Sequence, residues 1–206
     1  MCHQGDRSVK CGMRVEKIKY IYKLIIFNIF LHFNCIGAAM AVEEPKYELI
    51  QSTDVYEIRY YEDRLAVQTL QSLGADRAFG RLFRYISGQN QSASKIAMTA
   101  PVITSDEGSG LIMHFFLPKI YSTQTVPLPT SDNVKLVTIK GGYYAAIKYS
   151  GLSNNQNYKK HATLLKDILS KQGISIKGGP IQAIYSKPFT PFFLRRNEVM
   201  YPVNWY

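Results

Sequence analysis

Hydrophobic and polar positions alternate along much of the chain in short runs. Such alternation places apolar side chains on one face of an extended backbone, so we expect these runs to form half-buried strands. Valine, isoleucine, tyrosine and phenylalanine are frequent in them, which favours the same structure. The predicted strands are residues 47–50, 56–60, 65–70, 111–118, 134–139, 143–149, 181–185 and 197–203.

Two longer segments follow a helical period instead. In residues 76–87 the apolar side chains recur at helical spacing, and arginines share the opposite face. The apolar face comprises Ala78, Phe79, Leu82, Phe83 and Ile86, and the other comprises Arg77, Arg81 and Arg84. Asp76 is a suitable cap for this helix, and Gly88 is a suitable stop. Residues 158–172 form the second predicted helix, which ends at Gly173.

Residues 95–102 read Lys-Ile-Ala-Met-Thr-Ala-Pro-Val, an apolar run that begins with a charge. The run is too short for a stable helix and contains branched and small side chains, so we interpret it as a buried strand. Pro101 donates no backbone hydrogen bond, so this strand is expected to end there, or to lie at an edge or a bulge.

The predicted elements occur twice in the same order. Pairs of positions at a helix end, within a strand and at a strand end are separated by nearly the same number of residues. These pairs are Gly88 and Gly173, Met98 and Ala183, and Pro118 and Pro202. A near-constant offset predicts a tandem β-α-β-β repeat. Two such units pair most simply into one antiparallel sheet, curved or closed, with both helices outside it, so the expected fold class is α+β.

The beginning of the chain has the order of regions found in secretory signal peptides. Basic residues precede an apolar stretch at residues 24–37, and residues 39–41 read Ala-Met-Ala, the small-x-small form of a signal-peptidase site. We therefore expect residues 1–41 to be cleaved, and residues 42–206 to be a single exported domain, periplasmic or secreted. The alternative is an uncleaved anchor, but the apolar stretch is shorter than the about 20 residues that a spanning helix needs. The mature protein is thus expected to have no stable membrane span.

Cysteine and charge narrow the chemistry further. The cysteines all lie in the leader, as Cys2, Cys11 and Cys35. Residues 42–206 therefore hold no disulfide, thiolate nucleophile or cysteine metal ligand. The chain carries 25 Lys and Arg against 15 Asp and Glu, a formal net charge of +10, and the basic residues are scattered. This charge favours anionic ligands or surfaces, and without a nucleic-acid motif we expect no nucleic-acid partner.

Separated motifs resemble one known family. Residues 56–60 read Tyr-Glu-Ile-Arg-Tyr, residues 95–102 form the run described above, and residues 189–199 read Phe-Thr-Pro-Phe-Phe-Leu-Arg-Arg-Asn-Glu-Val. In this order they closely resemble the SOUL family of haem-binding proteins, over about residues 47–203. The resemblance implies a distorted antiparallel β-barrel with two helices, built from a tandem repeat. This fold is also similar to that of small-molecule-binding effector domains of bacterial regulators.

The resemblance further implies reversible binding of haem or another tetrapyrrole, as a carrier or buffer. The site would be a hydrophobic groove between residues 78–86 and residues 186–194. Haem requires an apolar slot for its ring and cations near its propionates. The expected haem-binding residues are Phe79, Arg81, Leu82, Arg84, Phe189, Phe192 and Phe193. The alternatives are that the phenylalanines of the loop pack onto the barrel mouth and that the arginines are only solvated.

Tyr60 stands where some members of the family carry a histidine that has been proposed as an iron ligand. Histidine ligation at this position is excluded, and phenolate is a known haem ligand, so Tyr60 is the candidate axial ligand. His114 and His161 are each expected at the edge of the core with satisfied hydrogen bonds. The polar cluster at residues 195–198 is expected to be a structural network of ion pairs and hydrogen bonds.

Two other functions stay open. An enzyme acting on tetrapyrroles or other amphipathic small molecules would need a buried carboxylate or a base in the groove. The candidates Glu57, Glu62 and Glu198 carry no distinguishing motif, and no HExxH, CxxC or Walker loop is present. We therefore expect no catalytic residues and a non-enzymatic protein. A haem-free interaction module is the third reading, which Tyr60 in place of histidine favours.

Overall fold

The computed structural model describes residue 23 and residues 42–71, 77–108 and 110–205. The predicted leader, apart from Lys23, and the predicted cap Asp76 lie outside the described residues. The strands are β1 (Glu48–Ser52), β2 (Glu57–Tyr61), β3 (Arg64–Leu70), β4 (Val102–Asp106), β5 (Leu111–Phe116), β6 (Lys135–Ile139), β7 (Gly142–Tyr149), β8 (Ile181–Ile184) and β9 (Asn197–Pro202). The helices are α2 (Ala78–Ile86), α3 (Asn155–Lys171) and the short 3-10 helix η1 (Phe192–Leu194).

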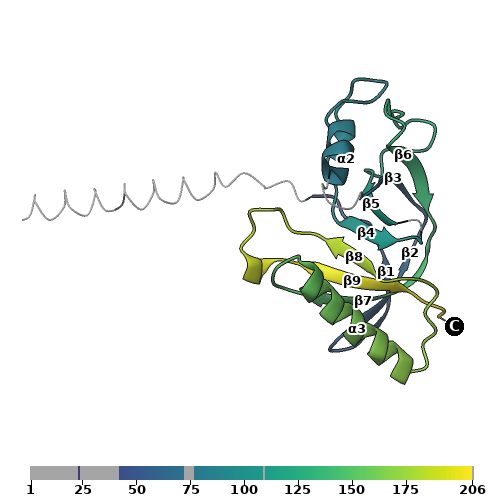
Figure 1. The fold of residues 1–206 in the computed structure, drawn as a ribbon, viewed down its shortest axis with the longest axis vertical. Coiled ribbons are helices and arrows are strands. Elements are labelled where there is room, and N and C mark those ends of the chain that lie inside the picture. The colour runs from purple at the N-terminus through teal and green to yellow at the C-terminus, as the bar shows by residue number, and fades with distance from the viewer. Residues whose placement is uncertain (1–22, 24–41, 72–76, 109, 206) are drawn as a thin grey trace, which may run out of the picture. The chain divides into compact units, whose positions relative to one another are not determined.

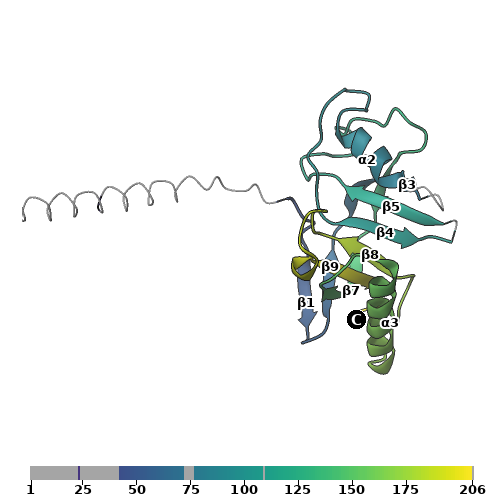
Figure 2. The same ribbon diagram turned by 60° about the vertical axis from the view of Figure 1, so that its left-hand side comes forward.

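One sheet contains all the strands of the described residues. Its order is β1-β2-β7-β9-β8-β4-β5-β3-β6, and every neighbouring pair is antiparallel. The sheet curls strongly (Figures 1 and 2). The edge strands β1 and β6 are not paired with each other in the described part of the chain, so the barrel is open. The predicted fold class, α+β with a distorted antiparallel barrel and two helices, is confirmed in this half-barrel form.

Side chains on the two faces of the sheet enter different cores. Along β7, Ala145 and Ile147 enter the cluster under α3, whereas Tyr144 and Ala146 enter a cluster on the other face. Strands β2 to β9 all contribute to that second cluster, which therefore fills the inside of the curl. α3 packs on β7 and β9, and α2 packs on β3 and β5 (Figure 1). The predicted alternation along the strands thus determines which side chains enter the inner core and which enter the two outer cores.

Glycines end both helices. Gly88 has a φ of 113°, and the next residue, Gln89, donates its backbone N–H to the carbonyl of Arg84. This is the left-handed arrangement that glycine favours at the end of a helix, so the predicted stop of α2 is confirmed. α3 likewise precedes Gly173, whose φ is 69°. Its start lies a few residues before the predicted one, because the side chain of Asn154 accepts the N–H of Asn157 as a cap.

The interpretation of residues 95–102 as a strand is wrong. Only Val102 belongs to a strand, and it begins β4 instead of ending a preceding one. The backbone N–H of Ile96 donates to Ile86 at the end of α2, and that of Ala100 donates to Glu43. The peptide bond between Ala100 and Pro101 is cis. The segment is apolar because α2 and the sheet cover it, and not because it pairs as a strand.

Without β1, the order of strands in the sheet is symmetric. If β2, β3, β4 and β5 are swapped with β6, β7, β8 and β9, respectively, the order read from one end equals the original order read from the other end. Each half contains the order strand-helix-strand-strand, as β3-α2-β4-β5 and as β7-α3-β8-β9. This correspondence supports the tandem repeat, which itself stays a prediction. β2 pairs with β7, and β3 pairs with β6, so each half completes its part of the sheet with a strand of the other half.

Candidate functional site

An aromatic pair lies on the exposed face of α2. The rings of Phe79 and Phe83 stack with their centroids 6.0 Å apart, and Phe79 also meets the ring of Phe115 edge-on at 5.2 Å. Phe79 and Phe83 are both exposed, with 42% and 49% of their surface open to solvent. Leu82 points the other way and is fully buried in the core between α2 and the sheet. Of these residues, Phe79 and Phe83 are therefore the ones that a ligand can reach.

The two arginines of α2 differ in how firmly they are held. Arg81 donates its Nε to the hydroxyl of Thr69 at 2.8 Å and its other guanidinium nitrogen to the carbonyl of Leu70. Arg84 is exposed, and its side chain makes no hydrogen bond to the described residues. Both line a hollow of about 200 Å³ next to residues 129–131. Arg84 is thus the arginine that can move to meet a ligand carboxylate.

The loop between β8 and β9 exposes a second aromatic group. Phe189 is 98% exposed, and Phe192 and Phe193, 56% and 63% exposed, meet edge-on at 5.5 Å. Arg195 shapes this loop by donating to the carbonyls of Thr190 and Pro188, at 2.8 and 2.9 Å. The loop aromatics therefore do not pack onto the barrel mouth, and Phe189 stands almost free in solvent.

The loop is anchored beside the start of α3. The backbone N–H of Gly151 donates to the carbonyl of Phe192 at 2.9 Å. Phe192 lines a hollow of about 390 Å³ with Leu152 and Lys160. The arginines of α2 and Phe192 of the loop thus line different hollows, so the structure gives two surfaces for the predicted site residues.

Tyr60, the candidate axial ligand, lies on β2. Its ring packs on Tyr143 at 5.1 Å, and the side chain is 37% exposed. Alternation along β2 puts Tyr60 on the same face as Ile58, which belongs to the core under α3. The hydroxyl accordingly belongs to the α3 side of the sheet and not to the α2 surface.

The polar cluster near the C-terminus is a buried ion-pair network, as predicted. Glu198 is fully buried and accepts from Arg59 at 2.6 Å and from Arg196 at 2.9 Å. Arg196 also pairs with Glu44 at 2.9 Å, and Arg59 pairs with Glu57 at 2.6 Å. Burial lowers the pKa of Arg59, but the hydrogen bond and the charge of Glu198 outweigh burial, and the net pKa is raised. Each charge in this network has a partner.

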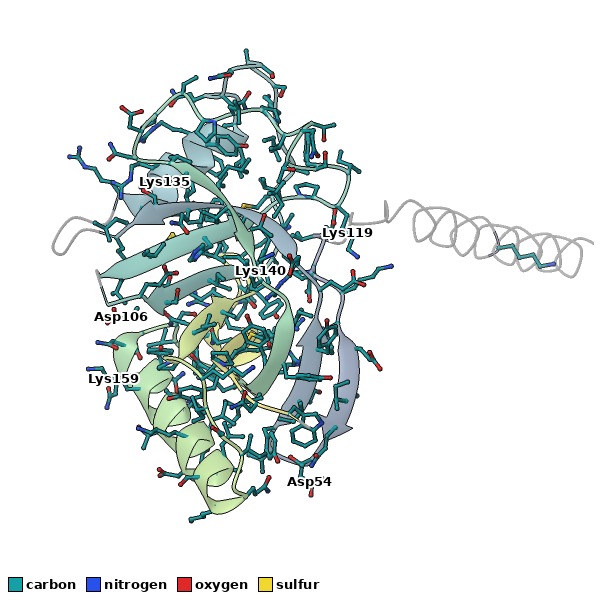
Figure 3. All side chains as sticks on the ribbon, turned by 90° about the vertical axis from the view of Figure 1, so that its right-hand side faces the viewer. Asp54, Asp106, Lys119, Lys135, Lys140 and Lys159 are labelled. Carbon is teal, nitrogen blue, oxygen red and sulfur yellow. The ribbon has the colours of Figure 1, made fainter. Side chains whose placement is uncertain are left out.

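One arginine on the inner face was missed by the sequence reasoning. Arg64 of β3 lies over the rings of Tyr61, Phe116 and Tyr144, at 4.3, 4.8 and 5.5 Å from their centroids. It lines a pocket of about 260 Å³ that opens beside Lys119, a residue labelled in Figure 3. The available signal was alternation, since Arg64 has the same parity in β3 as the inward-facing Ala66.

The two histidines of residues 42–206 lie in different surroundings. His161 stacks on Tyr149 at 4.0 Å, and its Nδ1 lies 2.8 Å from the carbonyl of Asn157, so it is satisfied as predicted. His114 is fully buried instead of lying at the edge of the core. Its Nε2 lies 3.0 Å from Gln68, but its Nδ1 has no hydrogen-bond partner among the described residues, so the prediction that its hydrogen bonds are satisfied is wrong for this nitrogen. Burial lowers the pKa of His114 to about 4. Within the described residues no group of three or more His, Cys, Asp or Glu side chains is arranged to hold a metal ion.

One protein is similar to this chain in sequence, and solved structures are similar to it in fold. Heme-binding protein 1 of Xenopus tropicalis is 26% identical over 131 residues, which are 60% of this chain and 68% of that protein. The C-terminal domain of EcmrR has a TM-score of 0.56 at 9% identity, over 78% of this chain and 99% of that one. A hydrolase from Listeria innocua has a TM-score of 0.52 at 9% identity, over 75% of this chain and 94% of that one. Since the two structures are only 9% identical to this chain, their similarity shows the fold alone.

The comparison with protein families is more specific. The pattern of the SOUL heme-binding protein family matches residues 42–202, which include all the strands and helices described above. The helices among the described residues are too short or too polar to cross a membrane. Family membership suggests a haem or tetrapyrrole ligand. By the extent of this match, the chain belongs to the SOUL heme-binding protein family.

Proposed function

We propose that the protein binds haem or a related tetrapyrrole reversibly and carries or buffers it without transforming it. The observation that carries this proposal is the exposure of aromatic side chains on α2 and on the loop before β9. These are the two segments that the family resemblance names. Clustered, exposed aromatic rings on a folded protein mark a surface that something apolar covers.

Apolar contact would supply most of the affinity. On the loop, Phe192 and Phe193 offer rings for the macrocycle. On α2, Phe79 and Phe83 offer rings, and Arg84 is the cation with freedom to meet a propionate. Burial contributes roughly 25 cal/mol per Å² of apolar surface, while lost translational freedom and loop ordering offset much of it. We expect reversible binding with a Kd in the micromolar range, roughly −8 kcal/mol. Such an affinity suits a protein that must release its ligand.

Iron ligation by Tyr60 is the competing account of the same function. The phenol is partly exposed and can reach solvent, but it lies on the α3 side of the sheet, beside Tyr143. Ligation by Tyr60 would therefore place the macrocycle on β2 and away from the stacked rings of α2. We propose that apolar contact dominates and that Tyr60 contributes little.

A haemin titration followed by absorption tests the proposal. Phe192→Ala combined with Phe193→Ala should weaken haemin binding about tenfold or more, because two ring contacts are lost. Ile120→Ala is the matched control, since Ile120 is an exposed apolar residue outside both surfaces. Tyr60→Phe should leave the affinity and the iron spectrum nearly unchanged. Loss of binding with Tyr60→Phe alone would replace the apolar account with phenolate ligation.

A non-enzymatic role is supported by the state of the candidate bases. The carboxylate of Glu198 is occupied by Arg59 and Arg196, and Glu57 is occupied by Arg59. Glu62 is exposed and lies outside the aromatic surfaces. These carboxylates therefore offer no base beside the proposed ligand.

Phe189 favours a second candidate, a haem-free interaction module. A phenylalanine ring that is 98% exposed is suited to docking on a partner protein as well as to covering a ligand. Wild-type protein that binds no haemin would exclude the carrier and leave this module as the function.

A further inference from the structure

Arg64 is a half-buried cation that has no ion-pair partner among the described residues. Its guanidinium lies among the rings of Tyr61, Phe116 and Tyr144, all of which are buried. The Nε of Arg64 is inaccessible to solvent and has no hydrogen-bond partner. Among the described residues no carboxylate lies within ion-pair distance of it, whereas the neighbouring Arg59 is paired with Glu198.

Such a charge is unfavourable unless something compensates it. Burial lowers the pKa of Arg64, but a guanidinium remains protonated over the physiological range, so the charge persists. The faces of the surrounding rings stabilise the cation in part. The rings do not provide the bidentate anionic acceptor that a guanidinium matches best. The site therefore lacks the partner for which its geometry is suited.

A pocket gives an anion access to this cation. It has a volume of about 260 Å³, and Arg64 lines both this pocket and a smaller void of about 20 Å³ on the inner face. Its apolar walls include Leu65, Phe116 and Leu117, while the exposed Lys46 and Lys119 lie at its rim. The pocket thus runs from solvent to the buried guanidinium.

The acidic residues at the rim are engaged elsewhere or face solvent. Glu44 pairs with Arg196, and Asp63 pairs with Lys140 at 2.9 Å while accepting the N–H of Gly141. A carboxylate oxygen of Glu43 accepts the backbone N–H of Lys119. Glu62 is exposed. None of these carboxylates neutralises Arg64, although all four border the pocket.

We propose that this pocket binds a small organic carboxylate. Its anionic group accepts hydrogen bonds from Arg64, and its apolar body lies against Phe116 and Leu117. Drug-sized ligands occupy sites of about 300–1,000 Å³, so a pocket of about 260 Å³ selects a ligand much smaller than a tetrapyrrole. The site is therefore separate from the proposed haem surfaces and does not depend on them.

Benzoate and benzamide are the probes, because they share a shape and differ in charge. Each is titrated into the full chain, and binding is followed by calorimetry and by NMR signals of Phe116 and Tyr121, which line the pocket. Benzoate should saturate with a Kd of about 1 mM or lower, shift these signals and raise the melting temperature. Benzamide should do none of these at the same concentration. Absence of benzoate binding, or equal binding of benzamide, would overturn the proposal.

Variants separate a binding role of Arg64 from a structural one. Arg64→Met keeps an unbranched apolar stem and removes the guanidinium charge. Benzoate affinity should fall about tenfold to a hundredfold, the equivalent of one charge-assisted hydrogen bond. The melting temperature of the unliganded variant should stay the same or rise, because an unpaired buried charge has gone. Lys119→Met, at the rim, should change the affinity less than threefold, within the range of a solvent-exposed charge.

Two results would contradict this assignment. Arg64→Met that still binds benzoate as tightly as the wild type would remove Arg64 from the site. The second result combines two variants. If Arg64→Met does not fold, and Arg64→Lys, which keeps the charge but not the bidentate fork, binds benzoate as tightly as the wild type, then the role of Arg64 is its contact with the rings and not recognition of the carboxylate.

Discussion

At the scale of single residues, buried charge is the feature that most constrains this protein. Glu198 is completely enclosed and is held by two guanidinium groups, while Arg64 has rings around it and no acid. The first arrangement is a closed network that stabilises the inner face. The second leaves an interaction to be completed from outside.

Glu198→Gln should therefore be strongly destabilising. The neutral amide removes the buried partner of Arg59, which keeps only the part-exposed Glu57, while Arg196 keeps only Glu44. Breaking a buried pair costs about 3–5 kcal/mol. Urea denaturation measures the loss in the free energy of unfolding. Glu62→Gln is the control, because Glu62 is exposed, and it should change stability by less than about 0.5 kcal/mol. Equal midpoints for the two variants would contradict the network.

His114 should make the protein less stable in acid. Its folded-state pKa is lowered from 6.5 to about 4 by burial, so between these values the unfolded chain binds a proton that the folded chain does not. Stability from this group is thus complete above pH 6.5, falls as the pH drops toward 4, and changes no further below that. Glu107 lies 3.7 Å away but is half exposed, and it does not overcome burial.

The test compares wild type with His114→Gln across that range. Two to three pKa units correspond to about 3 kcal/mol. The variant starts from a lower stability at pH 7, since a buried ring is lost, but its stability should fall by about 3 kcal/mol less between pH 7 and pH 4. Parallel curves for the two proteins would show that His114 titrates alike in both states.

At the scale of elements, the sequence predicted most strands because alternation reports which face is covered. It failed at residues 95–102, where the backbone N–H groups of Ile96 and Ala100 bond outside any ladder. The apolar composition of these residues therefore indicates that they are buried and not that they form a strand. The exposed aromatics of the loop were predictable from their Pro-rich surroundings. Alternation could place Arg64 on the inner face of the sheet. It could not specify the rings around Arg64, because these come from β2, β5 and β7.

Two glycines of one segment should respond oppositely to substitution. Gly88 follows α2 with a φ of 113°, a conformation that β-branched residues resist, so Gly88→Val should lower stability by roughly 1–3 kcal/mol. Gly80 lies inside α2, where an added Cβ would meet only the flexible end of Arg84 at 3.6 Å. Gly80→Ala should raise stability by up to about 1 kcal/mol. Thermal denaturation measures both, and a destabilised Gly80→Ala would contradict the helix assignment.

At the scale of the whole molecule, function depends on surfaces that the fold leaves uncovered. The curl of the sheet hides the inner core, and the helices cover two outer cores, yet the rings of Phe79, Phe192 and Phe193 stay in contact with solvent. Residues 42–206 contain no cysteine, so these surfaces are held without disulfides, by packing alone.

Export itself is a prediction from the leader. We expect cleavage after Ala41, so protein recovered from the exported fraction of its native host should begin at Val42. Intact-mass analysis of that fraction measures the start. A mass that includes residues 1–41 would support the uncleaved anchor instead.

Each half of the sheet is completed by a strand of the other half, and this determines when the chain can fold. β7 lies between β2 and β9, and β3 lies between β5 and β6, so neither half owns a complete sheet. While the ribosome is still making residues 117–134, β2 and β3 each have an edge whose partner has not yet been synthesised. Folding on this pathway must wait until β6 and β7 emerge. For the same reason, a chain truncated to either half would lack the strand of the other half that completes its part of the sheet.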